Sequence, residues 1–505
     1  MKTGYIKFLS AILCAALFLP LITLITLLIS CQTNNGNGDN KNTDNIDNSA
    51  QSDGQNGVEQ PTEKIIPDLP DVNYDGYQFS FLSMTGEEDY ERDDFFAEEE
   101  NGDVINDAKY ARNTHVEEKY GVKINTVNLG NYTMGSGFGN MKKAISAGDY
   151  SYDAAVFSAY DITSCVTGGF LLDLNSIPPL DLSKPWWDQR ANEDLSIKGR
   201  MFFTTGDISV TMSSSVWVIL FNKKLLKDYA IEDPYQLVRG GKWTFDKFAE
   251  LSRQVNTDLS GAGIYDQYNL YGMIACDDIM HCALNSIGEK CAKINNNGEI
   301  ELSLYNERTI AAMNKYMDFS YDKTNVFAFQ RVSDDTAYTM FENDQALFFP
   351  HGTATAIKLR AMETDFGILP FPKLDENQGG YYSPMINWWS LFVCVPILQE
   401  NAERTAVIIE ALAAESRYTV RPAYYEKSLI GKYSRDEESH EMLDIIFATR
   451  TYDFGWYFNF GGYNDSLYTL FRTYNRDFTS MYEKGLSKAE KDVQKTNDLF
   501  DEFLG

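Results

Sequence analysis

Residues 77–157 alternate between strand-like and helix-like patterns in the order β-α-β-α-β. Aromatic residues alternate with polar ones over residues 77–81, which predicts a strand. Residues 104–120 carry apolar side chains at helical spacing, and Gly121 follows at a position where helices commonly end. Right-handed helical crossovers between parallel strands place all the carboxyl ends along one edge of the sheet. This order therefore predicts an α/β fold in which a ligand would bind at the sheet edge formed by the carboxyl ends of the strands.

Strand-like and helix-like segments continue along the rest of the chain. Short apolar runs predict buried strands at residues 215–221, 346–349, 366–371 and 389–395. Helices are predicted at residues 245–255, with Thr244 as the N-cap, and at residues 402–414. Because a single hydrophobic core rarely exceeds about 250–300 residues, we expect residues 67–505 to form two lobes.

The first 31 residues have the pattern of a lipoprotein signal peptide. Lys2 and Lys7 precede an apolar stretch that ends in Leu-Ile-Ser-Cys at residues 28–31. The stretch is also long enough to span a bilayer, but no cluster of Lys or Arg follows it as a stop-transfer flank. We therefore expect residues 1–30 to be removed and Cys31 to carry lipid. The lipid would anchor the protein at the cell membrane, on its extracellular face.

Residues 31–66 have the composition of a flexible tether. Asn, Gly, Asp, Ser and Gln dominate this segment, which offers almost no side chain for a core. A random coil of this length reaches roughly 30–35 Å, which would hold a folded body clear of the lipid headgroups.

The charge and residue content exclude several classes of function. The chain has 44 Lys and Arg against 73 Asp and Glu, and a net charge of −29 disfavours nucleic acid as a partner. The four histidines form no zinc pattern, and no phosphate loop or nucleophile elbow is present, so we predict no metal, cofactor or catalytic activity. Aromatic residues make up 14% of the chain, which suits both core packing and sugar binding. Among the five cysteines of the body, Cys282 and Cys291 could form a bridge, and Cys394 is predicted to be a core thiol.

A series of short motifs resembles a known family. The motifs are Tyr-Asp at 152–153 and 160–161, Gly-Phe-Leu-Leu-Asp-Leu at 169–174, Phe-Asn-Lys-Lys-Leu-Leu at 221–226, Gly-Lys-Trp-Thr-Phe at 241–245 and Phe-Gly-Ile-Leu-Pro-Phe-Pro at 366–372. Their order and spacing are similar to those of extracellular solute-binding proteins of carbohydrate-type ABC importers, which are maltose-binding-protein-like. No single motif is decisive, and the resemblance covers essentially the whole body.

The resemblance implies a two-lobed periplasmic-binding-protein-like fold with crossing segments at a hinge. Crossings are expected near residues 207–214, 345 and 399. The first lobe would then comprise residues 67–210 plus 346–398, and the second lobe residues 211–345 plus 399–505. A small-molecule solute, most simply a glycan, would be held between the lobes and passed to membrane-spanning permease subunits.

The family also implies positions for ligand-binding residues. Asp161, next to Tyr160 at the end of a predicted strand, matches an acidic residue that binds sugar hydroxyls, although a helix N-cap is an equally good interpretation. Glu87 lies in the loop after the first strand, also a ligand position in the family, within an acidic run for most of which a solvated surface is the favoured interpretation.

Tryptophans offer further candidates. Trp388 and Trp389 should point to opposite faces of a strand, so that one could pack in the core and the other stack on a sugar. Trp456 matches a late aromatic residue of the family. Buried aromatic residues are more often plain core residues, so each of the three has this alternative.

The remaining candidates are weaker. His351, at a strand end, and Asp207 and Ser215, near the first crossing, are further expected ligand-binding residues. Residues 256–266 have oxygen-bearing side chains at calcium-loop spacing, but Gln267 stands where a calcium loop needs Glu, which favours a Gly-rich turn. Alternative functions are a secreted carbohydrate-active enzyme with a carboxylate pair, or a surface sensor or adhesion module.

Overall fold

The computed structural model describes residues 64–85, 94–131, 135–386, 388–425 and 437–502. The predicted signal peptide, the predicted lipidation site Cys31, most of the predicted tether and Glu87 lie outside the described residues. Within the described part, no helix is both long and apolar enough to cross a membrane.

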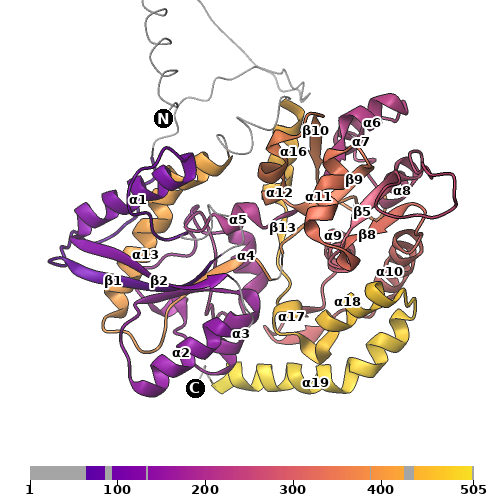
Figure 1. Cartoon of the computed structure of the whole chain (residues 1–505). Coiled ribbons are helices and arrows are strands. Elements are labelled where there is room, and N and C mark those ends of the chain that lie inside the picture. The colour runs from indigo at the N-terminus through magenta and orange to yellow at the C-terminus, as the bar shows by residue number, and fades with distance from the viewer. Residues whose placement is uncertain (1–63, 86–93, 132–134, 387, 426–436, 503–505) are drawn as a thin grey trace, which may run out of the picture. The chain divides into compact units, whose positions relative to one another are not determined.

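The first lobe is built on a four-stranded sheet with the strand order β12-β3-β1-β2 (Figure 1). Strands β1, β2 and β3 are parallel, and β12 runs antiparallel to β3. The strands are β1 (Tyr77–Thr85), β2 (Val122–Asn131), β3 (Ala154–Ser158) and β12 (Leu391–Cys394), and the helices between them are α1 (Val104–Tyr120), α2 (Ser136–Ala147) and α3 (Ala159–Thr167). The predicted β-α-β-α-β order is confirmed.

Helix α1 shows why the local prediction succeeded. The side chain of Asp103 accepts hydrogen bonds from the backbone N–H groups of Ile105 and Asn106, which would otherwise lack partners at the helix start. Gly121 ends the helix in the left-handed conformation, with φ 61°, which glycine adopts without strain.

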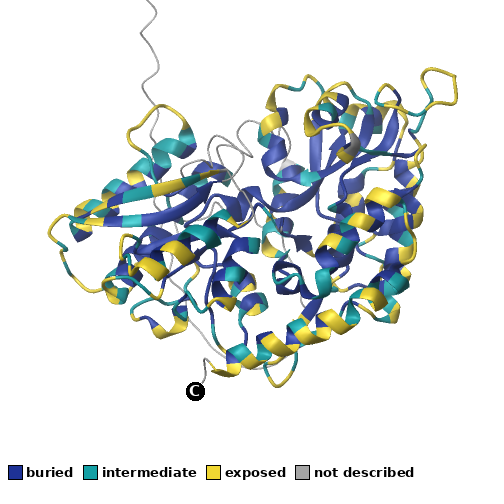
Figure 2. Ribbon diagram, turned by 60° about the horizontal axis from the view of Figure 1, so that its bottom comes forward, coloured by how far each residue is buried: buried dark blue, intermediate teal, exposed yellow. Residues whose placement is uncertain are grey.

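The second lobe is built on a five-stranded sheet with the order β10-β4-β9-β5-β8. Its strands are β4 (Trp217–Asn222), β5 (Tyr271–Ala275), β8 (Val326–Ala328), β9 (Ala346–Gly352) and β10 (Phe366–Leu369). Strand β5 is parallel to β8 and β9, whereas β4 is antiparallel to β9 and β10. Buried residues fill the centre of both lobes (Figure 2).

The remaining helices and short strands connect and cover the two sheets. The helices are α4 (Gln189–Leu195), α5 (Thr211–Ser214), α6 (Lys223–Asp228), α7 (Pro234–Arg239), α8 (Phe245–Ser252), α9 (Ile279–Ser286), α10 (Glu307–Ser320), α11 (Asp334–Glu342), α12 (Ala354–Lys358), α13 (Ala402–Ser416), α14 (Val420–Pro422), α16 (Glu437–Ala448), α17 (Phe454–Tyr457), α18 (Tyr463–Thr473) and α19 (Phe478–Glu502). The short strands are β6 (Ala292–Ile294), β7 (Ile300–Leu302), β11 (Ser383–Pro384) and β13 (Arg450–Thr451). Thr244 caps α8 by accepting a hydrogen bond from the Lys247 N–H group, as predicted.

The predicted lobe boundaries need correction. Strands β9 and β10 were expected in the first lobe, but both are hydrogen-bonded to β4 in the second sheet. Helix α13 was expected in the second lobe, but its Glu410 accepts hydrogen bonds from the indole N–H groups of Trp186 and Trp187 in the first. A buried apolar strand has the same local pattern in either sheet, so the pattern alone could not assign it.

Three segments, here called the crossing segments, lie side by side at the boundary between the lobes. Residues 204–217 and 383–391 pass from one lobe to the other, and residues 449–453, between α16 and α17 of the second lobe, run beside them. The segments are joined by a bridge between Val216 and Met385 and by a 3.2 Å hydrogen bond from the Met385 N–H group to the Thr451 carbonyl oxygen. The crossing expected near residues 207–214 agrees with the first of them. The crossings expected near residues 345 and 399 are wrong, because the chain stays within one lobe at each of those points.

Two smaller predictions can also be compared with the structure. The five cysteines of the body are free and buried, so Cys282 and Cys291 form no bridge, and Cys394 lies in the core. In the calcium-like loop, the Asp258 carboxylate accepts hydrogen bonds from the N–H groups of Ser260, Gly261 and Gly263. This side chain therefore organises a Gly-rich turn.

Candidate functional site

Polar and aromatic residues follow the parallel strands of both sheets at their carboxyl ends. In the first lobe, β3 leads directly into Tyr160 on the first turn of α3. In the second lobe, β5 is followed by Asp277 and Asp278, and β9 ends at His351 and Gly352. Ligands of open α/β sheets bind at this edge, so these residues form the candidate site.

A hydrogen-bond network connects the two lobes at this edge. The Asn464 side chain on α18 donates a 2.8 Å hydrogen bond to the Tyr160 hydroxyl oxygen. The Tyr468 hydroxyl, one turn further along α18, donates a 2.8 Å hydrogen bond to the Asp278 carboxylate. The hydroxyl groups of Tyr160 and Tyr468 also share a hydrogen bond. Because Tyr160 belongs to the first lobe and the other residues to the second, the network spans the lobe boundary.

The Asp278 carboxylate is the centre of this network. It also accepts a hydrogen bond from the Trp388 side chain and a weaker one, at 3.6 Å, from the Cys276 thiol. Burial raises the pKa of Asp278 to about 6, and the negative charge of Asp277 adds to this rise. Tyr160, Asp278, Trp388 and Tyr468 are all partly exposed.

Asp277 has a different environment. Its carboxylate forms an ion pair with Arg472, and burial raises its pKa. Carboxylate and thiol groups of Cys276, Asp277 and Asp278 lie within 4.8 Å of one another, a spacing that could suit a metal ion. However, Arg472 already neutralises one carboxylate, and Tyr468 and Trp388 occupy acceptor positions on the other. The donor set thus fits a hydrogen-bonding role better than a metal site.

His351 lies in an aromatic box next to the crossing segments. Its ring lies 5.7 Å from the Trp217 ring, 5.6 Å from Tyr338 and 6.3 Å from Phe329, measured between centroids. Its Nδ1 atom is 2.5 Å from the Thr355 hydroxyl oxygen. Burial lowers the pKa of His351 to about 3, so the imidazole is neutral at physiological pH and can donate or accept a hydrogen bond.

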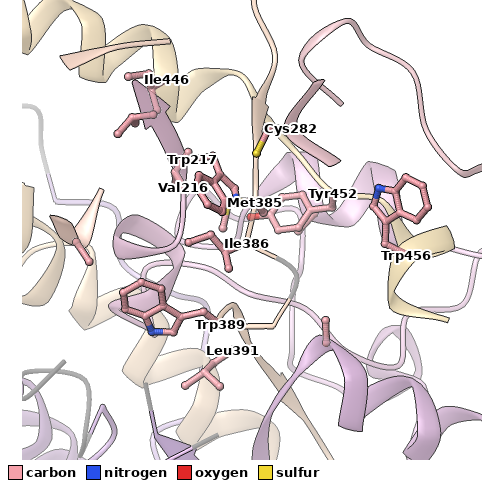
Figure 3. Packing of buried hydrophobic residues seen from close by; sticks show 14 of the residues in the cluster. Val216, Trp217, Cys282, Met385, Ile386, Trp389, Leu391, Ile446, Tyr452 and Trp456 are labelled. Atoms are coloured by element: carbon pink, nitrogen blue, oxygen red, sulfur yellow. The ribbon is translucent and has the colours of Figure 1, made fainter. Parts of the chain in front are cut away.

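The two adjacent tryptophans do not point to opposite faces. They lie in a turn before β12, which begins only at Leu391, so strand alternation does not apply to them. Their rings are nearly parallel, at 14°, with centroids 5.8 Å apart. Trp389 is buried in the core (Figure 3). A Cβ atom on Gly352 would lie 2.8 Å from Ile386 and 3.5 Å from the Trp389 ring, so Trp389 packs close to this glycine. Only Trp388 of the pair is partly exposed.

Comparison with known proteins identifies the family. A family model described as bacterial extracellular solute-binding protein matches residues 103–390, which is more than half of the chain. The chain belongs to this family. A search of curated protein sequences gives no match for the solute-binding protein.

Solved structures show the same two-lobed fold. An ABC substrate-binding protein from Listeria monocytogenes, in complex with cycloalternan, aligns with a TM-score of 0.54 at 13% identity, covering 84% of this chain and 99% of its own. The GacH receptor of Streptomyces glaucescens, studied unliganded and with acarbose, aligns with a TM-score of 0.51 at 12% identity, covering 84% and 98%. A solute-binding protein from Agrobacterium radiobacter, in complex with ribitol, aligns with a TM-score of 0.52 at 10% identity, covering 83% and 99%. Because the sequence identities are this low, these alignments establish only the fold of the solute-binding protein.

Two of the candidate ligand-binding residues predicted from the sequence, Asp161 and Trp456, instead have roles in holding the fold. The Asp161 carboxylate accepts hydrogen bonds from the N–H groups of Gly135, at 2.6 Å, and Gly137, at 3.2 Å, and is only 1% exposed. It therefore holds the start of α2, a capping role at the preceding helix instead of the following one. Trp456 is fully buried, donates to the Asn285 side chain at 3.3 Å and packs against His281, so it is a core residue (Figure 3).

Two other candidates lie near the crossing segments. Asp207 is buried and paired with Arg417 at 3.3 Å and Arg421 at 3.6 Å, so its charge is already balanced. Ser215 is buried, and its hydroxyl has no hydrogen-bond partner among the residues that the structure describes. Its carbonyl oxygen accepts a 2.9 Å hydrogen bond from the Ile386 N–H group, which ties two crossing segments together.

The structure thus brings Tyr160 and Trp388 together and adds residues that the sequence interpretation missed. Asp277 and Asp278 directly follow a buried strand, just as Tyr160 does, and this position could have revealed them. Asn464 and Tyr468 lie on a helix near the end of the chain, where no local pattern relates them to a strand edge.

Proposed function

We propose that this solute-binding protein captures an oligosaccharide between its lobes and delivers it to the permease of an ABC importer. The observation that carries the proposal is the Asp278 network, which joins carboxylate, phenol and indole groups from both lobes at the carboxyl edges of the sheets. Sugars present hydroxyl groups for such hydrogen bonds and apolar faces for aromatic rings.

The composition of the site favours a neutral solute. Asp278 accepts hydrogen bonds, the tyrosine hydroxyls can donate and accept them, and His351 is uncharged. Arg472 is paired with Asp277. A buried anion would find no free positive charge among the residues of the Asp278 network, so the desolvation of an anionic solute would go uncompensated there. The relatives solved with cycloalternan, acarbose and ribitol support a sugar or related polyol.

We also propose that diacylated Cys31 and the tether at residues 31–66 hold the protein on the extracellular face of the cell membrane. A two-chain lipid anchor gives stable attachment, and the tether would let the body reach a permease in the same membrane. Mass spectrometry of the N-terminal peptide tests this part. A Cys31 carrying diacylglycerol supports the anchor, and an intact residue 1–30 segment in the mature protein contradicts it.

The test of the ligand is a thermal-shift screen followed by calorimetry. Maltotetraose, cycloalternan and acarbose represent neutral or near-neutral glycans, and peptides and anionic sugars serve as competing classes. A ligand that binds only the folded state raises Tm by mass action. Binding by Asp278→Asn should be weaker than wild type, whereas Asp318→Asn, an exposed change on α10, should bind normally.

Two outcomes would contradict the proposal. A Tm shift with peptides but with no glycan would remove the sugar assignment. Turnover of a glycan by the purified protein, followed by chromatography, would favour the alternative of a secreted carbohydrate-active enzyme.

A further inference from the structure

The last helix of the chain contacts both lobes. Figure 1 shows α19 in yellow, extending from beside α18 towards α2 and α3. The helix comprises Phe478–Glu502 and is much longer than the other helices of the second lobe. Its two ends have different partners.

The first half of α19 packs on the second lobe through stacked aromatic rings. The Tyr482 ring is nearly parallel to the Tyr463 ring, at 9°, and to the Tyr305 ring, at 11°, with centroids 5.3 Å and 4.4 Å apart. Tyr305 also stacks on Phe478. Further along, Asn497 exchanges two hydrogen bonds with the backbone of Ile300 in β7, at 2.9 and 3.0 Å. These contacts hold α19 to the second lobe.

The final turn of α19 instead contacts the first lobe. The buried Phe500 ring packs edge to face against Phe202, with centroids 5.4 Å apart. Asp501 forms an ion pair with Lys198. The segment that carries Phe202 and Lys198 is part of the first lobe, because the neighbouring Thr204 bridges to Val393 in β12.

The turn that carries Lys198 is built to face the second lobe. Lys198 and Gly199 both have positive φ angles, 51° and 73°, in the tight turn between Ile197 and Arg200. A lysine is uncommon in this left-handed conformation, which Asn, Asp or Gly usually occupies. Its side chain is only 9% exposed although it lies at the tip of a turn, because Asp501 and the backbone near Gly298 cover it.

We propose that this contact between the Lys198 turn and Phe500–Asp501, here called the strap contact, sets the balance between the closed and open arrangements of the lobes. Its two sides belong to different lobes and lie outside the three crossing segments. Any rotation of the lobes about those segments must therefore break or rearrange it. The same arrangement contains the Tyr160–Asn464 hydrogen bond at the candidate site. The strap contact thus favours the arrangement in which the binding residues of both lobes meet, and it raises the fraction of binding-competent protein.

The test measures the distance between the lobes without any ligand. Spin labels on Lys143→Cys in α2 and Asn314→Cys in α10 report this distance by double electron–electron resonance. Both positions are exposed, and the native cysteines of the body are buried. Phe500→Ala and Lys198→Ala should each move the distance distribution away from the wild-type value, with a new population at longer distance.

A matched control lies at the other end of the same helix. Phe478→Ala removes a buried aromatic ring of equal size, but its stacking partner Tyr305 is in the second lobe. This variant should lower stability and leave the distance distribution unchanged. Distributions identical to wild type in both Phe500→Ala and Lys198→Ala would overturn the proposal. Lys198→Ala removes one ion pair whose partner, Asp501, is exposed, and takes no aromatic ring from the core, so it should fold even if Phe500→Ala does not.

The role of the strap contact can be tested whichever ligand the protein binds. The distance measurement contains no solute, so its result stands whether or not a glycan binds. If maltotetraose binds the wild-type protein, Phe500→Ala should raise its Kd about threefold or more, through the smaller competent fraction. Phe478→Ala should leave that Kd unchanged. An unchanged Kd in a Phe500→Ala protein that has lost the wild-type distance would show that the strap contact does not control binding.

Discussion

The Tyr468 hydroxyl donates a 2.8 Å hydrogen bond to the carboxylate of Asp278, whose pKa burial raises to about 6. The two residues lie almost two hundred positions apart in the chain, on α18 and after β5. This pair places a desolvated acceptor at the edge of the second sheet and connects it to Tyr160 of the first lobe. The lobes therefore meet through groups that can also bind the hydroxyls of a sugar.

Removing the Tyr468 hydroxyl should weaken ligand binding. Tyr468→Phe leaves the ring but removes the donor to Asp278 and the hydrogen bond with Tyr160. We expect a loss of about 1 kcal/mol, or about fivefold in Kd, measured by calorimetry with the glycan found in the screen. Tyr381→Phe is the control, because its hydroxyl donates to the Val238 carbonyl oxygen within the second lobe. Equal Kd values for Tyr468→Phe and wild type would exclude this residue from the site.

Glu410 should make the protein less stable as pH rises. Burial raises the pKa of Glu410 to about 7 from an ordinary value of 4.5, so the folded protein holds a proton that the unfolded chain has released. The stability from this group is fully present below pH 4.5 and is lost as pH rises to about 7, on the order of 3 kcal/mol. In Glu410→Gln, Tm should fall less between pH 4.5 and pH 7.5 than in wild type. Glu98→Gln changes an exposed residue and should keep the wild-type dependence of Tm on pH. If Glu410→Gln also kept the wild-type dependence, Glu410 would not be its source.

Asp161 should matter for stability and not for binding. Asp161→Ala removes the acceptor for the Gly135 and Gly137 N–H groups, so the start of α2 loses its cap. We expect a loss of about 1–2 kcal/mol in the free energy of unfolding, measured by urea denaturation, with an unchanged glycan Kd. A large rise in Kd without loss of stability would instead return Asp161 to the ligand site.

Trp456 should behave as a core residue. Trp456→Ala leaves a cavity beside His281 and removes the hydrogen bond to Asn285, so we expect a loss of about 3–5 kcal/mol in unfolding free energy. Trp388→Ala removes a partly exposed ring beside Asp278 and should cost far less stability but weaken glycan binding. If denaturation showed the larger loss of stability in Trp388→Ala, and calorimetry showed the weaker glycan binding in Trp456→Ala, then Trp388 would be the core residue and Trp456 the binding residue.

Local patterns predicted the secondary structure better than the assignment of strands to lobes. Helix α1 ends at Gly121 and α8 is capped by Thr244 as expected, because caps depend on residues within one turn of the helix end. The strand at 346–352 was found, but its lobe was wrong, since its hydrogen-bond partners in β4 and β5 are distant in sequence. Trp388 and Trp389 were misplaced for a similar reason, because the strand begins two residues later than its apolar pattern suggests.

By itself, the sequence determined the α/β character of the body, the caps of its helices and the presence of chemical groups at the ends of buried strands. These features depend on hydrophobic periodicity and on contacts within a few residues. Only the tertiary structure decided which side chains share a site. The Asp161 carboxylate caps the start of α2, and the Trp456 side chain is buried in the core. The Tyr468 hydroxyl, on a helix near the end of the chain, donates a hydrogen bond to Asp278. Such choices depend on the packing of distant segments, where burial and the need to satisfy each polar group select one partner among many.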